Sequence, residues 1–216
     1  MKKTYVYIDG FNFYYSAVKD TPFRWLDFSK LLPRVFPKNQ TCRIKYFTAD
    51  VTPFPWSEKA PERQQAYLRA LRTIPNLEII KGHFRTRQKP MKVVSPPPPY
   101  LKVFCTEEKG SDVNIASHLL LDGMQNAYEC AIVVSGDSDL LTPIKMVKTE
   151  LLKTVGVLNP QRISGPNRRQ LRKSAGLQGA ANFHKHGIRW KQLEDSLFPE
   201  QMTDKKGMFV MPSGWK

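Results

Sequence analysis

Two aspartates, Asp137 and Asp139, stand one residue apart after an apolar run, 131–134, that predicts a buried strand and that Ser135 and Gly136 end. Ligands bind at the carboxyl ends of strands in open α/β sheets. Neighbouring carboxylates raise each other's pKa, and a hard cation such as Mg²⁺ or Mn²⁺ relieves their repulsion. The alternative is that Ser135 or Asp137 only caps the next helix. These residues alone leave both interpretations open.

Two further segments place acids in comparable positions. Asp9 follows the apolar run 5–8, and Asp112 lies in the first turn of a predicted helix, where Ser111 is the expected N-cap. Each acid could serve only a turn or the helix dipole. Three separate placements are harder to explain as unrelated caps, so we expect one metal-binding and catalytic set: Asp9, Asp112, Asp137 and Asp139, with Asn12 as a neutral orienting group.

These motifs resemble those of a known family. IDGFN at 8–12, KGSDV at 109–113 and VSGDSD at 134–139 are similar, in order and spacing, to the three signature motifs of NYN domains, the PIN-like nuclease domains of the LabA/DUF88 group. The resemblance spans nearly the whole chain. It implies a PIN-like α/β fold, an acidic site that binds Mg²⁺ or Mn²⁺, and cleavage of RNA phosphodiesters.

One position departs from the family pattern. Many members carry a further Asp where this chain has His118. Six residues place His118 about 120° around the helix from Asp112, so we leave it outside the metal shell and expect a structural role. Asp122 lies about 15 Å along the same helix and is too far from Asp112 to share a metal.

The chain is strongly basic, with a formal net charge of +15 and a pI near 9.8. Such an excess favours a polyanionic partner, with nucleic acid ahead of an anionic membrane. The alternative is a generally basic protein whose charges are only solvated. For Lys109 the alternative is a solvated lysine, and for Ser135 it is an N-cap. The predicted nucleic-acid contacts are Arg85, Arg87, Lys89, Lys92, Lys109, Ser135, Arg168, Arg169 and Arg172.

Composition narrows the class of protein. No apolar run approaches the length of a membrane span, and no signal-peptide region precedes the first strand, so we expect a cytoplasmic protein without a membrane partner. The three cysteines are far apart, which suits reduced thiols and predicts no structural zinc. The sequence indicates no particular oligomeric state.

Strand and helix patterns alternate along the chain. Strands are expected over 5–8, 43–48, 77–80, 131–134 and 154–158, and helices over 62–72, 112–125 and 140–151. This order predicts a three-layer α/β/α sandwich of PIN-like (Rossmann-like) form with a mostly parallel sheet. We assign 1–197 to this nuclease domain. Within it, the basic, proline-rich insertion 85–108 is expected to be a protruding arm or edge hairpin, and 198–216 to be a C-terminal tail on the surface.

The function predicted from these features is that of a metal-dependent nuclease, an endoribonuclease that hydrolyses RNA with a metal-activated water. One alternative is a non-catalytic RNA-binding or regulatory module with the same fold. A second is a phosphatase of the haloacid dehalogenase type, because Asp137 and Asp139 resemble its Asp-x-Asp motif. That family places the motif on the first strand with a Thr or Val two residues on, whereas here the pair comes late and Leu141 follows.

Overall fold

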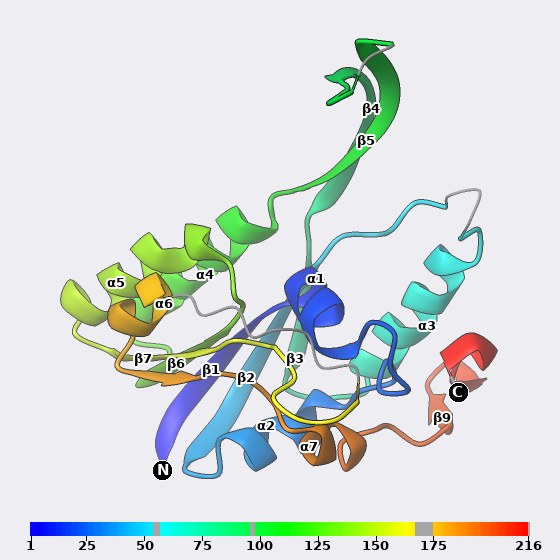
Figure 1. The fold of residues 1–216 in the computed structure, drawn as a ribbon. Helices are drawn as coiled ribbons and strands as arrows, with labels where there is room; N and C mark the ends of the chain where they lie inside the picture. Colours follow the sequence, from blue (N-terminus) through cyan, green and yellow to red (C-terminus); the bar gives the residue numbers. More distant parts are fainter. Residues whose placement is uncertain (54–56, 96–97, 167–174, 216) are drawn as a thin grey trace.

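The computed structural model describes residues 1–53, 57–95, 98–166 and 175–215. Its centre is a six-stranded sheet in the order β3-β2-β1-β6-β7-β8 (Figure 1). Every neighbouring pair in this sheet is parallel. The strands are β1 (Lys2–Asp9), β2 (Asn39–Thr48), β3 (Leu77–Lys81), β6 (Cys130–Val134), β7 (Thr154–Leu158) and β8 (Phe183–Lys185).

Helices cover both faces of this sheet (Figure 1). One face carries α1 (Gly10–Phe13), a π-helical turn (Tyr14–Val18), α2 (Phe28–Val35), α3 (Ala60–Leu71) and α7 (Trp190–Glu194). The other carries α4 (Ser111–Met124), α5 (Leu141–Thr149) and α6 (Ala175–Ala180). The predicted three-layer α/β/α fold with a mostly parallel sheet is confirmed.

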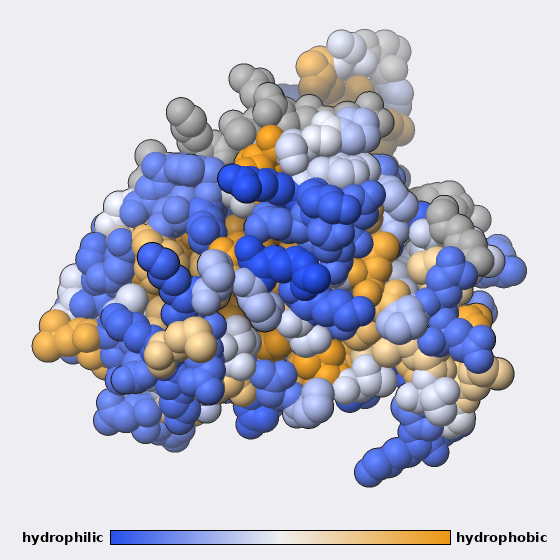
Figure 2. Space-filling model, turned by 90° about the horizontal axis from the view of Figure 1, so that it is seen from below, coloured by the Kyte–Doolittle hydropathy of each residue, from blue (hydrophilic) through white to orange (hydrophobic). Residues whose placement is uncertain are grey.

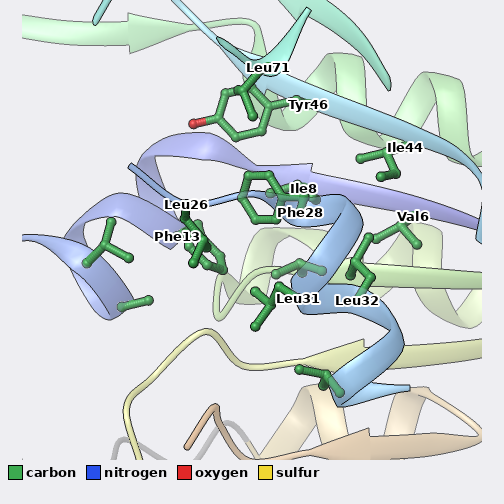
Figure 3. Packing of buried hydrophobic residues seen from close by; sticks show 14 of the residues in the cluster. Val6, Ile8, Phe13, Leu26, Phe28, Leu31, Leu32, Ile44, Tyr46 and Leu71 are labelled. Carbon is green, nitrogen blue, oxygen red and sulfur yellow. The ribbon is translucent and has the colours of Figure 1, made fainter. Parts of the chain in front are cut away.

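Alternation along the strands divides the core into two clusters, because successive side chains of a strand point to opposite faces. On β1, Val6 and Ile8 join the cluster under α2, whereas Tyr7 joins the cluster under α4 and α5. Figure 3 shows Phe28 and Leu32 of α2 on the side of Val6 and Ile8, in the first of these clusters. Both faces of the central strands are therefore buried, which explains why they are continuous apolar runs.

The order of the strands reverses between β1 and β6. From β1 the chain adds β2 and β3 on one side, and later adds β6, β7 and β8 on the other. Ile8 pairs with Val134 at the ends of the two strands, so Asp9 and Ser135 emerge side by side. Such a switch point, at the carboxyl ends of parallel strands, is the usual ligand site of open α/β sheets.

The insertion forms an arm that projects from the body (Figure 1). Its strands, β4 (His83–Lys92) and β5 (Tyr100–Lys109), pair with each other in an antiparallel sheet separate from the central one. The insertion is thus a protruding hairpin that follows the edge strand β3, in line with the expected arm or edge hairpin, and it does not pair with the central sheet. We call β4 and β5 the arm.

The segment expected to be a surface tail makes its own hairpin, β9 (Gln201–Asp204) and β10 (Gly207–Val210). Phe198 and Trp215, on either side of this hairpin, are buried in the first core cluster. The ring of Trp215 lies 6.1 Å from that of Trp25.

Among the helices that the structure describes, none combines the length and the apolar composition of a membrane-spanning segment.

Candidate active site

Asp9 is the buried centre of the candidate site. It ends β1 and caps α1, and its side chain is only 6% exposed. Its Oδ1 accepts the backbone N–H of Asn12 at 3.0 Å, and its Oδ2 accepts the hydroxyl of Ser135 at 2.9 Å. These two hydrogen bonds fix the orientation of the carboxylate.

Asn12 and Ser135 tie the ends of β1 and β6 together. The Asn12 side-chain oxygen accepts the backbone N–H of Gly136 at 3.0 Å, and the Ser135 hydroxyl accepts that of Asp137 at 3.1 Å. The predicted orienting role of Asn12 therefore has a structural basis, although Asn12 orients the β6 loop together with Asp9. The Ser135 hydroxyl accepts the Asp137 N–H as a capping residue would, and it also donates to Asp9, so capping is only part of its role.

Gly10 explains why a glycine follows Asp9. A Cβ at this position would lie 2.6 Å from the carbonyl oxygen of Phe47 and 2.7 Å from the ring of Tyr46. No side chain fits there without moving β2, so the close approach of α1 to this strand requires glycine.

Asp137 and Asp139 follow β6 in a short 3₁₀ turn, Ser138–Leu140. Asp137 Oδ1 accepts the backbone N–H of Asp139 at 2.9 Å and caps this turn. The capping interpretation of Asp137 is thus confirmed. It does not compete with metal binding, because an ionised carboxylate offers about four lone pairs and the cap uses one.

Asp112 lies in the first turn of α4, as predicted. The predicted N-cap, Ser111, is wrong: the helix is capped by Gly110, whose φ of 96° is accessible to glycine. The hydroxyl of Ser111 instead donates a hydrogen bond to the carboxylate of Glu108, at the end of β5. The turn from the arm into α4 therefore brings a further acid, Glu108, next to Asp112.

Electrostatic interactions link these acids. Burial raises the pKa of Asp9 to about 6 against the lowering effect of its two hydrogen bonds, and the nearby Asp112 and Asp137 raise it further. Partial desolvation, then Asp137 and Asp139, raise the pKa of Asp112. Burial raises the pKa of Glu108, and Asp9 and Asp112 add to this effect. Like-charge effects therefore link Asp9 with Asp112 and Asp137, and Asp112 with Asp137 and Asp139.

Glu108 and Tyr46 were not among the predicted residues. Tyr46 is buried with its ring against Gly10, and Asp9 and Glu108 add to the effect of burial that raises its pKa. Glu108 directly precedes the KGSD motif, so its position beside a recognised acidic motif was the available signal. Tyr46 gives no such signal, because an aromatic residue on a buried strand is ordinary core.

The donor set fits a hard divalent cation by its chemistry. All four predicted ligands are carboxylates, and none forms an ion pair with a cationic side chain in the described parts of the chain. Their mutual repulsion is thus uncompensated. However, among the described residues no three His, Cys, Asp or Glu side chains are placed to hold one metal ion. Convergence on a shared cation stays a prediction.

One predicted phosphate contact, Ser135, lies at the acids, where its hydroxyl donates to Asp9, and the others within the described chain lie on the arm. On the arm, Glu107 pairs with Arg87 at 3.5 Å, Lys89 at 2.7 Å and Lys109 at 2.9 Å. Arg87 and Lys89 thus share one counter-charge with Lys109, and their role at RNA stays a prediction. The second predicted group, Arg168, Arg169 and Arg172, lies outside the described residues.

His118 has a structural environment, as expected. Its Nδ1 lies 3.1 Å from the ammonium nitrogen of Lys45, which forms a 2.6 Å ion pair with Asp122. The hydroxyl of Tyr7 donates to the same carboxylate at 2.7 Å. This buried network links β1, β2 and α4. Asp122 is therefore engaged away from the candidate site, in agreement with the prediction that it shares no metal with Asp112.

The sequence and the fold of this chain are similar to those of known proteins. Residues 3–175 match the family model described as NYN domain. The chain is 27% identical over 240 aligned residues to 6-hydroxy-3-succinoylpyridine 3-monooxygenase HspA of Pseudomonas putida, with 99% of this chain and 75% of that protein covered. A crystal structure of a protein of unknown function from Vibrio parahaemolyticus is similar in fold, with a TM-score of 0.54, 16% identity, and coverage of 91% of this chain and 96% of that one.

Proposed function

This chain belongs to the NYN domain family, which is a family of PIN-like nucleases, and on this premise we propose that it is a metal-dependent endoribonuclease. The observation that carries the proposal is the acidic cluster at the switch point between β1 and β6. Asp9 is buried there with Asp112 and Asp137 close enough to raise its pKa. A buried carboxylate among like charges is costly unless a cation balances it.

In this proposal Asp9, Asp112, Asp137 and Asp139 hold Mg²⁺ or Mn²⁺. When bound, such an ion neutralises charge on the phosphate and lowers the pKa of a water that attacks phosphorus. Asp9 contributes a fixed carboxylate, because Asn12 and Ser135 hold both of its oxygens. The remaining acids approach from α4 and from the turn after β6, so three separate segments supply the negative charge.

Glu108 adds a fifth carboxylate to the proposal. It reaches the cluster from the end of β5 and interacts with Asp9 and Asp112. Its raised pKa means that it binds a proton more readily than an exposed glutamate does. We propose that Glu108 holds the start of α4, which carries Asp112, at the edge of the site through the Ser111 hydroxyl that donates to it.

The proposed function is tested by incubating purified protein with single-stranded RNA, single-stranded DNA and their duplexes, with Mg²⁺, Mn²⁺ or EDTA. Internal cleavage of RNA that needs a divalent ion is expected, and Asp9→Asn should abolish it. Asp195→Asn, the same change at an exposed position outside the cluster, is the control. Metal-dependent RNA binding without cleavage by the wild type would favour the non-catalytic RNA-binding alternative.

The relative HspA raises a second candidate, because its similarity covers 99% of this chain. Its name describes a monooxygenase acting on 6-hydroxy-3-succinoylpyridine. Such a reaction consumes dioxygen and a reductant, so oxygen uptake with that compound and NADH distinguishes it from phosphodiester hydrolysis. The cluster of carboxylates favours the nuclease. The phosphatase alternative is not favoured, because Asp137 and Asp139 follow β6 and not the first strand.

A further inference from the structure

The pairing of β4 with β5 divides the arm into two faces. Residues opposite each other in an antiparallel ladder point to the same side, and successive pairs alternate. One side, which we call the Phe104 face, includes the pairs Phe84–Glu108, Gln88–Phe104, Pro90–Lys102 and Lys92–Tyr100. The other, the Glu107 face, consists of His83–Lys109, Arg85–Glu107, Arg87–Cys105, Lys89–Val103 and Met91–Leu101.

The Phe104 face starts at the candidate active site. The ring of Phe84 packs edge-on against Phe11, with centroids 5.2 Å apart, and Phe11 follows Asp9 and Gly10. Glu108, opposite Phe84 in the ladder, interacts with Asp9. A chain lying along this face therefore leads directly to the acidic cluster.

Further out, the same face presents aromatic rings to solvent. Phe104 is 72% exposed and Tyr100 is 60% exposed. Burying a large apolar side chain is favourable by about 1.5–3 kcal/mol, so rings left in water on a projecting arm call for a partner. By contrast, the face of the body seen from below in Figure 2 is mostly hydrophilic, with apolar side chains in scattered patches.

Cations accompany these rings. Lys102 lies between Tyr100 and Phe104 on the same side of β5, each about 7 Å away along the strand, and Lys92 is opposite Tyr100. Neither lysine forms an ion pair within the part of the chain that the structure describes. Alternating rings and free ammonium groups suit a ligand with alternating planar bases and phosphates.

The Glu107 face is different in charge. There Arg87, Lys89 and Lys109 gather around Glu107, and the two lysines hold the pKa of its carboxyl well below the usual range. These three cations share a single carboxylate, so part of their charge is neutralised while the face stays positive. The number of basic residues on this face thus overstates its capacity to bind phosphates.

We propose that the Phe104 face of the arm binds single-stranded nucleic acid, with unpaired bases stacked on Phe104 and Tyr100 and phosphates near Lys92 and Lys102. This inference rests on the proposed function and adds that the substrate is unpaired RNA, held outside the cleavage site. Stacking on aromatic side chains tolerates any base, so the arm supplies affinity without sequence preference. Duplex RNA buries its base faces and cannot use the rings.

The decisive test compares the two faces by fluorescence anisotropy, with a short labelled RNA in EDTA so that nothing is cleaved. Loss of one stacking ring should weaken binding about 5- to 150-fold. The double variant Phe104→Ala/Tyr100→Ala should therefore bind the single strand much more weakly than the wild type does. Both proteins should bind the matching duplex equally, and the wild type should bind that duplex more weakly than the single strand. The control is Met91→Ala/Leu101→Ala, which removes apolar side chains that are 53% and 49% exposed on the Glu107 face, and it should bind as the wild type does.

A conservative pair separates stacking from simple apolarity. Phe104→Trp should keep or strengthen binding to the single strand, whereas Phe104→Leu should weaken it about 5- to 150-fold, as the loss of one ring does. Equal binding by the wild type and the Phe104→Ala/Tyr100→Ala variant would overturn the proposal. So would a self-associated wild type that this variant turns into monomers in sedimentation, because the rings would then contact a second copy of the chain.

Binding and cleavage are read out separately, so the two proposals fail separately. A wild type that binds single strands through these rings but cleaves nothing with Mg²⁺ or Mn²⁺ would contradict the nuclease and support the arm. Metal-dependent cleavage that is equally fast in the Phe104→Ala/Tyr100→Ala variant at low RNA concentration would contradict the arm and support the nuclease.

Discussion

Replacing Asp9 by Asn should stabilise the metal-free protein while abolishing cleavage. Burial and neighbouring acids raise the pKa of Asp9 from 3.8 to about 6. The unfolded chain therefore ionises this group at lower pH than the folded protein does. Folding is favoured by the protonated form, and the stability contributed by this group is fully present below about pH 4 and is lost as pH rises through about 6.

The magnitude follows from the size of the shift. About two pKa units at roughly 1.4 kcal/mol each give a cost of about 3 kcal/mol for the ionised Asp9 at pH 8. An amide at this position carries no charge, and its oxygen can still accept the Asn12 N–H that Asp9 Oδ1 accepts now. Its NH2 group cannot accept the Ser135 hydroxyl, and the loss of that hydrogen bond costs about 1 kcal/mol. The variant should therefore be about 2 kcal/mol more stable than the wild type at pH 8, and about 1 kcal/mol less stable than it at pH 4.

Urea unfolding in EDTA at both pH values measures this difference, with unchanged m-values as the check that the same surface unfolds. Adding Mn²⁺ should stabilise the wild type more than the variant. An ion that binds the folded state adds stability, and the variant lacks one of the proposed carboxylate ligands. Asp195→Asn, the control, removes only an exposed ion pair with Lys191, so it should change stability by less than about 1 kcal/mol and leave the effect of Mn²⁺ unchanged. An Asp9→Asn protein that is less stable than the wild type at pH 8 would refute the reasoning that an uncompensated charge is buried there.

Three further outcomes are expected. Asp137→Asn should abolish cleavage while the thermal midpoint stays within a few degrees of the wild type, because the amide oxygen can keep the cap; turnover at the wild-type rate would make this residue a cap alone. Gly10→Ala should destabilise the protein by about 1–3 kcal/mol in urea unfolding, since a Cβ would lie 2.6 Å from a backbone oxygen of β2, and an unchanged midpoint would contradict that contact. Lys102→Gln should flatten the salt dependence of single-strand binding by about 0.7 in the log–log slope, whereas Arg87→Gln should change it less because Arg87 already pairs with Glu107; equal changes would contradict the distinction between the two faces.

Hydrophobic patterns predicted the central sheet well because its strands are buried on both faces. A continuous apolar run such as 154–158 can hardly be anything else between polar segments, and β7 has these bounds. The ends of helices, which depend on capping hydrogen bonds, were predicted less well. The sequence favoured Ser111 as a cap, yet Gly110 begins the helix, because a positive φ was needed to turn from the arm into α4.

The arm shows a second limit of sequence patterns. Arg85, Arg87, Lys89 and Lys92 stand close together in the sequence and were predicted as one phosphate-binding group. Lys92 falls on the opposite face of the ladder from the other three, which share their face with Glu107. Charge density along a chain does not reveal this, because the register of the hairpin decides which residues share a side and which counter-charges they meet.

The same point applies to the acids. Capping and metal binding were treated as alternatives for Asp137, but the structure gives it a cap and leaves acceptor capacity free. Asp9 likewise caps α1 while it lies among like charges. A cap fixes the direction of a carboxylate, and a fixed carboxylate that feels like charges nearby favours a cation over solvent. In this fold the helix starts after β1 and β6 are therefore what orients the acids, and the capping residues are the expected metal ligands for that reason.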